Sequence, residues 1–263
     1  ALYGDLDLSL LDEMPPGRTP VTTSLRSMDH RTAVYDFVRS EIAMGRQAFI
    51  VYPLVDDSEK IDLLSAKREF ERLSSEVFLQ ERVGLIHGQL ASAEKDSVMR
   101  EFIAGKIDIL VATTVIEVGI DVPNASVMLI EHAERFGLSQ LHQLRGRVGR
   151  GTAESHCILV AEPGEDALER LRIFRDTSDG FEVARADLRI RGQGDLFGSQ
   201  QHGRDPVLRF ADLLVDEDLL VDAQSEARAI VAEDPELKRA DHAAIQAHLE
   251  GLYKHRLEMY GVG

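Results

Sequence analysis

The chain has 263 residues, of which 44% are hydrophobic, so it is long enough for one large core or for a core with a smaller satellite. This hydrophobic content excludes an intrinsically disordered chain. Acidic residues outnumber basic residues by 46 to 30, and the formal net charge of −16 disfavours non-specific adhesion to nucleic acid or to an anionic membrane. Any contact with DNA must therefore be local.

Cysteine content and apolar run lengths indicate the compartment. The single cysteine, Cys157, cannot form an internal disulfide or a thiolate cluster for zinc, and we expect a cytoplasmic protein. The longest apolar stretch, residues 47–55, is far shorter than the ~20 residues that cross a bilayer. Membrane insertion is therefore not expected. Because the chain opens at Ala1 and not at a methionine, in the middle of a sequence pattern, we expect a fragment of a longer polypeptide.

The first part of the chain predicts a connector followed by a domain. Residues 1–28 contain Pro15, Pro16, Gly17 and Pro20, which predict an extended connector that docks on the domain without building it. Strands then alternate with helices from residue 29 to residue 163. The predicted strands span residues 47–52, 83–86, 107–112, 125–130 and 155–161. Several of them are continuously apolar, which predicts an α/β fold with a mainly parallel sheet covered by helices on both faces.

The helices between these strands are predicted from capping residues and helical spacing. Asp29 is expected to cap the first helix, and Gly45 to end it in a left-handed conformation. Residues 58–80 predict a second, charged helix. Ser92 is expected to cap a third helix that ends before Gly105 and buries the apolar residues Val98, Met99, Phe102 and Ile103. In such folds ligands collect at the carboxyl ends of the strands.

From about residue 164 the alternation stops and helical patterning takes over. Helices are predicted over residues 167–177, 181–190, 208–233 and 243–260, and a loop with four glycines, residues 191–203, separates the second from the third. These elements predict a helical hairpin with its loop over residues 164–205 and a C-terminal helical region over residues 206–263. Residues 210–236 hold nine acidic side chains and one basic side chain.

The most informative segment is SQLHQLRGRVGRG, residues 139–151. It predicts one helix capped by Ser139. Its polar stripe is formed by Gln140, Gln143, Arg147 and Arg150. The adjacent stripe, which faces the core, is formed by Leu141, Leu144 and Val148. Gly146 and Gly149 each cost about 1 kcal/mol relative to alanine inside a helix, which indicates that a bulky ligand approaches closely. Planar guanidiniums beside glutamines suit a polyphosphate, and the plainer alternative is a solvated basic stripe.

Sequence motifs extend this interpretation to a family. QLRGRVGR, residues 143–150, resembles motif VI of superfamily 2 helicases. LVATTVIEVGIDVP (110–123), LIHGQL (85–90) and IVYPLV (50–55) resemble further motifs of the second motor lobe. The opening LYGDLDLSLLDEMPPGR and the run TSDGFEVARADLRIRGQGDLFGSQQHG, residues 177–203, resemble the RecG family of branch-migration DNA helicases. The resemblance covers essentially the whole chain and implies a RecA-like second motor lobe, a translocation hairpin with its loop, and C-terminal helices.

This resemblance implies a nucleotide-facing group. Arg147 and Arg150 are expected to sense the phosphates of ATP, and Gln143 to position them or the attacking water. Gly119 and Asp121 are expected to complete the nucleotide edge, although Asp121 alone would more simply be a turn residue before a proline.

A DNA-facing group and a coupling group are also implied. His87, Gly88, Thr113 and Thr114 are expected to follow the DNA backbone. The residues expected to couple lobe closure to movement are Arg170, Arg191 and Gln201. The alternative for the two arginines is a surface ion pair with Glu169, Asp187 or Asp195. The chain departs from the family at Gln193, Gln200 and His132, where proline, arginine and asparagine are usual.

The sequence contains no G-x-x-x-x-G-K-[ST] phosphate loop, because Arg100 stands where the first glycine of such a loop before Lys106 would be. ATP and Mg²⁺ are therefore expected to be held mainly by a missing first lobe, with neither bound to the isolated chain, which should not turn over ATP alone. LLVDED, residues 213–218, mimics a magnesium-binding strand but lies in a helical, acidic region. We expect no metal site there or elsewhere in the chain.

The implied function is that of the second motor lobe of an ATP-driven DNA helicase that remodels stalled forks and Holliday junctions. Two alternatives are a transcription-repair coupling translocase, which acts through RNA polymerase, and a non-catalytic RecA-fold adaptor that binds a partner through residues 210–236. The expected partners are branched or duplex DNA, the missing N-terminal motor lobe and wedge domain in cis, and single-stranded DNA-binding protein. No membrane partner is expected, and the implied location is the bacterial nucleoid.

Overall fold

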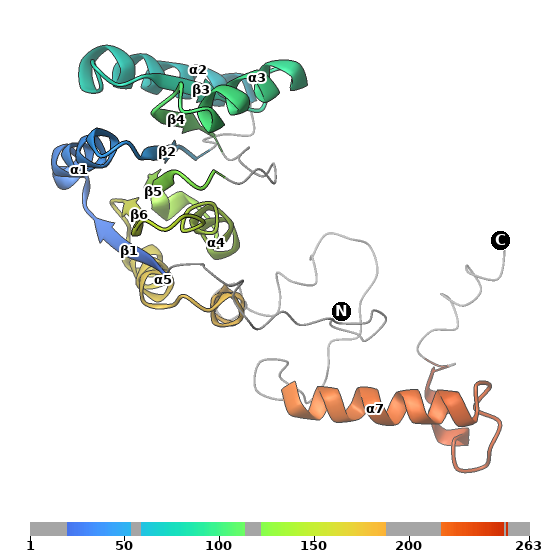
Figure 1. Ribbon diagram of the computed structural model, residues 1–263. Coiled ribbons are helices and arrows are strands. Elements are labelled where there is room, and N and C mark those ends of the chain that lie inside the picture. The colour runs from blue at the N-terminus through green and yellow to red at the C-terminus, as the bar shows by residue number, and fades with distance from the viewer. Residues whose placement is uncertain (1–19, 54–58, 114–121, 188–216, 250, 252–263) are drawn as a thin grey trace. The chain divides into compact units, whose positions relative to one another are not determined.

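The computed structural model describes residues 20–53, 59–113, 122–187, 217–249 and 251. The chain forms two compact units, one of residues 11–200 and one of residues 1–10 with 201–263. In the larger unit, six described strands form one parallel sheet in the order β1-β6-β5-β2-β4-β3 (Figure 1). The strands are β1 (Val21–Arg26), β2 (Gln47–Val51), β3 (Val83–Ile86), β4 (Ile109–Ala112), β5 (Ala125–Glu131) and β6 (Ser155–Val160).

Strands β2, β4 and β5 are buried along their whole length. Their continuously apolar sequences are those of strands covered on both faces, and the predicted parallel α/β sheet is confirmed. Successive side chains alternate between two cores. Ile50 and Leu129 belong to one, and Phe49 and Met128 to the other.

Residues 21–26, expected within an extended connector, form the edge strand β1. It pairs with β6 from Val21 opposite Ser155 to Arg26 opposite Val160. The connector prediction is wrong for these six residues, which build the sheet. The prolines upstream obscured a short β-branched run, VTT, that favours a strand.

Helices cover both faces of the sheet. Figure 1 shows α1 (Arg31–Ala43) and α4 (Leu138–Arg145) on opposite sides. Phe70 of α2 (Glu59–Arg72) packs against the core beneath α1, and the other core contains residues of α3 (Ser92–Ile103), α4 and α5 (Glu165–Asp176). Helix α2 is shorter than the predicted span of residues 58–80, because a π-helical turn, Leu73–Val77, follows it.

The ends of α1 were only partly predicted. Gly45 has φ of 81° and ends the helix in the expected left-handed conformation. Asp29 is not the cap, because a 3-10 turn, Met28–His30, precedes α1 and places His30 at the N-cap position.

Helix α3 differs from its prediction in a similar way. Ser92 is its first residue and Ala91 its N-cap, whose backbone N–H donates to Glu94 Oε2 at 3.0 Å. Gly105 is left-handed, as expected, with φ of 68°. Ile103 was expected to be buried, but it is 45% exposed at the last position of the helix.

The helical hairpin and C-terminal region follow the predicted pattern where they are described. Helix α5 is followed by helical residues 180–187, and the smaller unit contains α7 (Glu217–Glu233) and helical residues 243–249. Between the last two, the Asp234 carboxylate accepts from the backbone N–H groups of Lys238 and Arg239 and pairs with His242 Nδ1 at 2.9 Å. None of the described helices has the length and apolar character needed to cross a membrane.

Candidate functional site

The residues expected to face phosphate lie on α4 and in the turn that follows it. Helix α4 begins at Leu138, with Gly137 as its N-cap, so Ser139 is its second residue and not its cap. Gln140 reaches back to accept the Gly137 N–H at 3.0 Å. The helix ends at Arg145, and Gly149 has φ of 80°. The prediction of one helix through residue 151 is wrong, because a left-handed residue redirects the chain.

Residues 146–150 form what we call the arginine turn. Gln143 remains exposed on α4, whereas Arg147 is half-buried and Arg150 is exposed beyond the helix end. These three side chains therefore do not share one helical stripe. Arg150 Nε donates to the carbonyl of Gly146 at 3.1 Å, which closes the turn. The expected core-facing residues are buried as predicted: Leu141, Leu144 and Val148.

The arginine turn ends against the start of β5. A Cβ atom on Gly151 would lie 2.2 Å from the carbonyl oxygen of Pro123, so this close approach requires glycine. Pro123 precedes β5 by two residues, which places the end of the turn at the amino end of that strand, whereas ligands in such folds collect at the carboxyl ends. Gly119 and Asp121 precede Pro123 in sequence and lie outside the described residues.

A second group lies at the carboxyl edge of the sheet. Ile86 of β3 pairs with Ala112 of β4, so His87 and Thr113 follow neighbouring strands in register. His87 is 6% exposed and Thr113 is 3% exposed. Neither His87 Nδ1 nor Thr113 Oγ1 has a hydrogen-bond partner among the described residues. Buried polar atoms almost always have partners, so these two atoms are candidates for contact with a ligand. Thr114 lies outside the described part of the chain.

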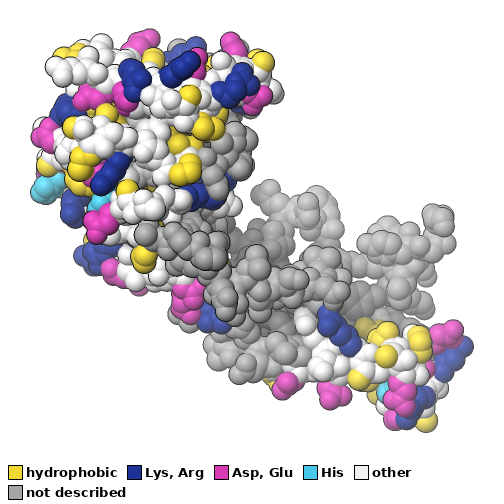
Figure 2. Space-filling view, viewed as in Figure 1, with side chains coloured by type: hydrophobic (Ala, Val, Ile, Leu, Met, Phe, Trp, Pro, Cys, Tyr) yellow, Lys and Arg dark blue, Asp and Glu magenta, His cyan; other side chains and the backbone are white. Residues whose placement is uncertain are grey.

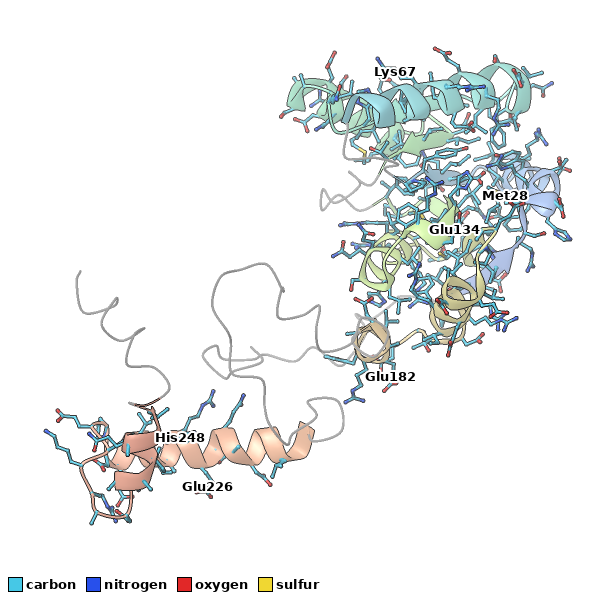
Figure 3. The ribbon with its side chains drawn as sticks, turned by 180° about the vertical axis from the view of Figure 1, so that it is seen from behind. Met28, Lys67, Glu134, Glu182, Glu226 and His248 are labelled. Atoms are coloured by element: carbon cyan, nitrogen blue, oxygen red, sulfur yellow. The ribbon has the colours of Figure 1, made fainter. Side chains whose placement is uncertain are left out.

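Two lysines that the sequence analysis did not single out lie near His87. Lys95 Nζ on α3 donates to the carbonyl of exposed Gly88 at 2.7 Å. Burial lowers the pKa of His87, and the charges of Lys67 and Lys95 lower it further, so the imidazole is neutral at pH 7. Figure 3 labels Lys67 on α2. No local motif marks these lysines, because they lie on two different helices, α2 and α3.

The surface around these helices has no single sign of charge. Figure 2 shows Lys and Arg side chains interspersed with Asp and Glu over this end of the larger unit. Phosphate binding at this edge would therefore depend on a few positioned groups and not on a broad basic face.

Arg170, expected in the coupling group, lies on α5. Its Nη2 donates to the backbone carbonyl of Glu134 at 2.6 Å, so this contact is not the surface ion pair given as an alternative. Arg170 Nε and Glu134 Oε2 are buried and have no partner within the described ranges. Glu134 follows His132, whose φ of 52° is a conformation that asparagine adopts more readily. Arg191 and Gln201 lie outside the described residues.

The chemistry of the arginine turn suits phosphate oxygens. Its two guanidiniums, with the nearby Gln143 amide, are hydrogen-bond donors for an anion, and they cannot ligate Mg²⁺. Among the residues that the structure describes, no cluster of three His, Cys, Asp or Glu side chains could hold a metal ion.

Comparisons with known proteins give the family. Residues 29–152 match the model of the Helicase conserved C-terminal domain, and residues 177–262 match that of ATP-dependent DNA helicase RecG, domain 3, C-terminal. ATP-dependent DNA helicase RecG of Thermotoga maritima is 55% identical over 238 residues, which cover 90% of this chain and 30% of that protein. This chain belongs to the RecG family. RecG of Bacillus subtilis is 46% identical over 249 residues, or 94% of this chain and 36% of that protein.

A solved structure supports the same assignment of fold. The structure of RecG bound to a three-way DNA junction matches with a TM-score of 0.65 and 55% identity, over 83% of this chain and 28% of that chain. The expected RecA-like lobe is therefore confirmed. The chain spans about a third of the length of its curated RecG relatives. The RecG-specific match over residues 177–262 favours this family over the transcription-repair coupling translocase.

Proposed function

We propose that this chain forms the second motor lobe of an ATP-driven DNA helicase that remodels stalled replication forks and Holliday junctions. The observation that carries the proposal is the pair of buried, unpartnered atoms, His87 Nδ1 and Thr113 Oγ1, at neighbouring strand ends of a RecG-family lobe. Lys67 and Lys95 place two positive charges near His87, and the Glu94 carboxylate lies near it as well. With Gly88 and Thr114, these groups follow the phosphates of the DNA backbone.

The arginine turn faces the nucleotide. ATP, when bound, supplies the phosphoryl group whose hydrolysis drives the motor, and the preceding lobe holds most of it together with Mg²⁺. Arg147 and Arg150 neutralise charge on the phosphates, and Gln143 positions them or the attacking water. An arginine in this role contributes ~10³ to 10⁵ in rate. The contact of Gly151 with Pro123 supports a shared edge with Gly119 and Asp121, which precede Pro123 in sequence.

The hairpin couples closure of the two motor lobes to movement along DNA. Arg170, Arg191 and Gln201 are assigned to this step, and the bond from Arg170 to the Glu134 carbonyl supports the assignment because it joins α5 to the turn after β5. The partners are branched or duplex DNA and the preceding lobe and wedge domain, with single-stranded DNA-binding protein as a further partner. Together with the bacterial origin of these relatives, such a substrate supports a location in the bacterial cytoplasm, in association with the nucleoid.

The test uses the full-length protein that contains this chain. We expect Arg150→Ala to lower DNA-stimulated ATP hydrolysis at least about 100-fold, because the phosphate charge loses a guanidinium. Arg100→Ala is the matched control, since Arg100 is exposed on α3, and it should leave hydrolysis unchanged. Undiminished hydrolysis in Arg150→Ala would reject the motor assignment. This chain on its own should show no ATP hydrolysis.

A further inference from the structure

One side of α4 contacts the helical hairpin along its length. Ser139, His142 and Arg145 recur every three residues and so share this side. Ser139 Oγ lies 3.2 Å from Asp187 Oδ2, at the second hairpin helix. A Cβ atom on Gly180, where that helix begins, would lie 3.0 Å from His142 Nε2. Figure 3 labels Glu182 on the same helix. The helix that leads into the arginine turn therefore lies directly against the hairpin.

Arg145 makes the most extensive of these contacts. Only 6% of this residue is exposed, and its Nη1 donates to the backbone carbonyls of Phe174 at 3.1 Å and Thr177 at 2.7 Å. Its guanidinium carbon also lies 4.2 Å from the centroid of the Phe174 ring. The Phe174 carbonyl is in the last turn of α5 and has no partner within that helix. Arg145 therefore caps α5 and holds the elbow of the hairpin, which we define as residues 174–180.

The position of Arg145 in the chain links two sites. It is the last residue of α4 and comes directly before the arginine turn, which Arg150 closes onto Gly146. Because the last residue of α4 is bonded to the elbow, a displacement of the turn that shifts this residue would also shift the elbow. We propose that Arg145 is a positioning residue that transmits the state of the arginine turn to the hairpin elbow. This inference rests on the proposed function, and it concerns a different contact from that of Arg170 with Glu134.

Stability alone does not require an arginine at this position. Burial lowers the pKa of Arg145, so keeping the guanidinium charged there costs free energy. Apolar residues of similar volume in place of buried charged groups are often neutral or stabilising. A guanidinium, in contrast, bonds several carbonyls in a fixed geometry, which suits a contact that must move as one piece with its neighbour.

The test compares Arg145→Met with wild type in the full-length protein. Methionine keeps the packing against Phe174 and removes the hydrogen bonds. We measure base pairs unwound per ATP hydrolysed on a forked DNA, and we expect this ratio to fall at least about fivefold, the low end of measured coupling between sites. Arg145→Lys, which keeps a donor, should restore part of the ratio. Arg172→Met is the control, because Arg172 is exposed on α5 and lies outside the elbow.

The outcomes separate this inference from the proposed function. A merely structural role would lower unwinding and hydrolysis in proportion, through loss of folded protein, and the unchanged ratio would overturn the inference. Gly180→Val gives a second test if Arg145→Met does not fold, because its side chain pushes against His142, whose Nδ1 lies 3.3 Å from Arg145 Nη2, and so displaces the Arg145 guanidinium. An unchanged ratio in that variant overturns the inference as well. If wild type neither hydrolyses ATP nor unwinds DNA, it is the proposed function that fails.

Discussion

At the residue scale, one left-handed glycine determines the shape of the arginine turn. Gly149 has φ of 80°, and Gly45, which ends α1, has φ of 81°. An L-residue in this conformation is strained by roughly 1–2 kcal/mol. A Cβ atom on Gly45 would meet nothing within 4 Å, so alanine there tests backbone strain alone. The two glycines thus have the same conformation at positions with different expected roles.

We expect Gly149→Ala and Gly45→Ala each to lower the free energy of unfolding of this chain by about 1 kcal/mol. Urea denaturation measures both. In the full-length protein only Gly149→Ala should slow ATP hydrolysis, by about tenfold or more, because it shifts Arg147 and Arg150. Inside a continuous helix, alanine would instead stabilise by about 1 kcal/mol. A stabilised Gly149→Ala would therefore contradict the turn.

At the element scale, local patterns predicted the sheet better than they predicted the site. The apolar runs of β2 and β5 could be recognised because each strand is covered on both faces. The stripe of Gln143, Arg147 and Arg150 fitted a helix equally well, since helical spacing does not register the φ of Gly149. Contacts such as Arg145 with Phe174, 29 residues apart, leave no spacing signal at all. They arise only once α4 and α5 pack on the same face.

A buried charge joins α1 to β5. Glu131, at the end of β5, is fully buried. It accepts from Arg31 at 2.8 Å and from the Tyr35 hydroxyl at 2.8 Å, both on α1. Burial and the Glu131 charge raise the pKa of Tyr35 to about 12, so its proton stays in this bond at neutral pH. The network orients the strand end from which the turn containing Glu134 begins.

We expect Glu131→Gln to lower the free energy of unfolding by ~2 kcal/mol. The change weakens the hydrogen bonds to a charged group and leaves the Arg31 guanidinium without its negative partner. The measurement is urea denaturation of the larger unit within this chain, with the slope unchanged and the midpoint lowered. Glu162→Gln, at an exposed position after β6, is the control and should change stability by less than about 0.5 kcal/mol. Equal effects of the two changes would show that the Glu131 network contributes nothing.

At the scale of the whole molecule, the net charge of −16 opposes DNA binding, so a contact depends on a few cations placed near the bound phosphates. Charges more than ~10 Å away are largely screened at 0.1 M salt, so the acidic remainder does not prevent a contact at His87. Lys67 and Lys95 are the cations that act on His87. The number of phosphates that this chain neutralises should therefore be small.

This count can be measured from the salt dependence of binding. The logarithm of the binding constant for duplex DNA falls with the logarithm of salt concentration by ~0.9 per phosphate neutralised. For this chain we expect a slope of about −2 by fluorescence anisotropy between 50 and 200 mM NaCl, and about −1 after Lys95→Ala. Lys106→Ala is the matched control, because exposed Lys106 precedes β4 at the amino edge of the sheet and should leave the slope unchanged. A slope that Lys67→Ala and Lys95→Ala do not reduce would place the DNA on another surface, because only cations that release counterions from the bound phosphates contribute to it.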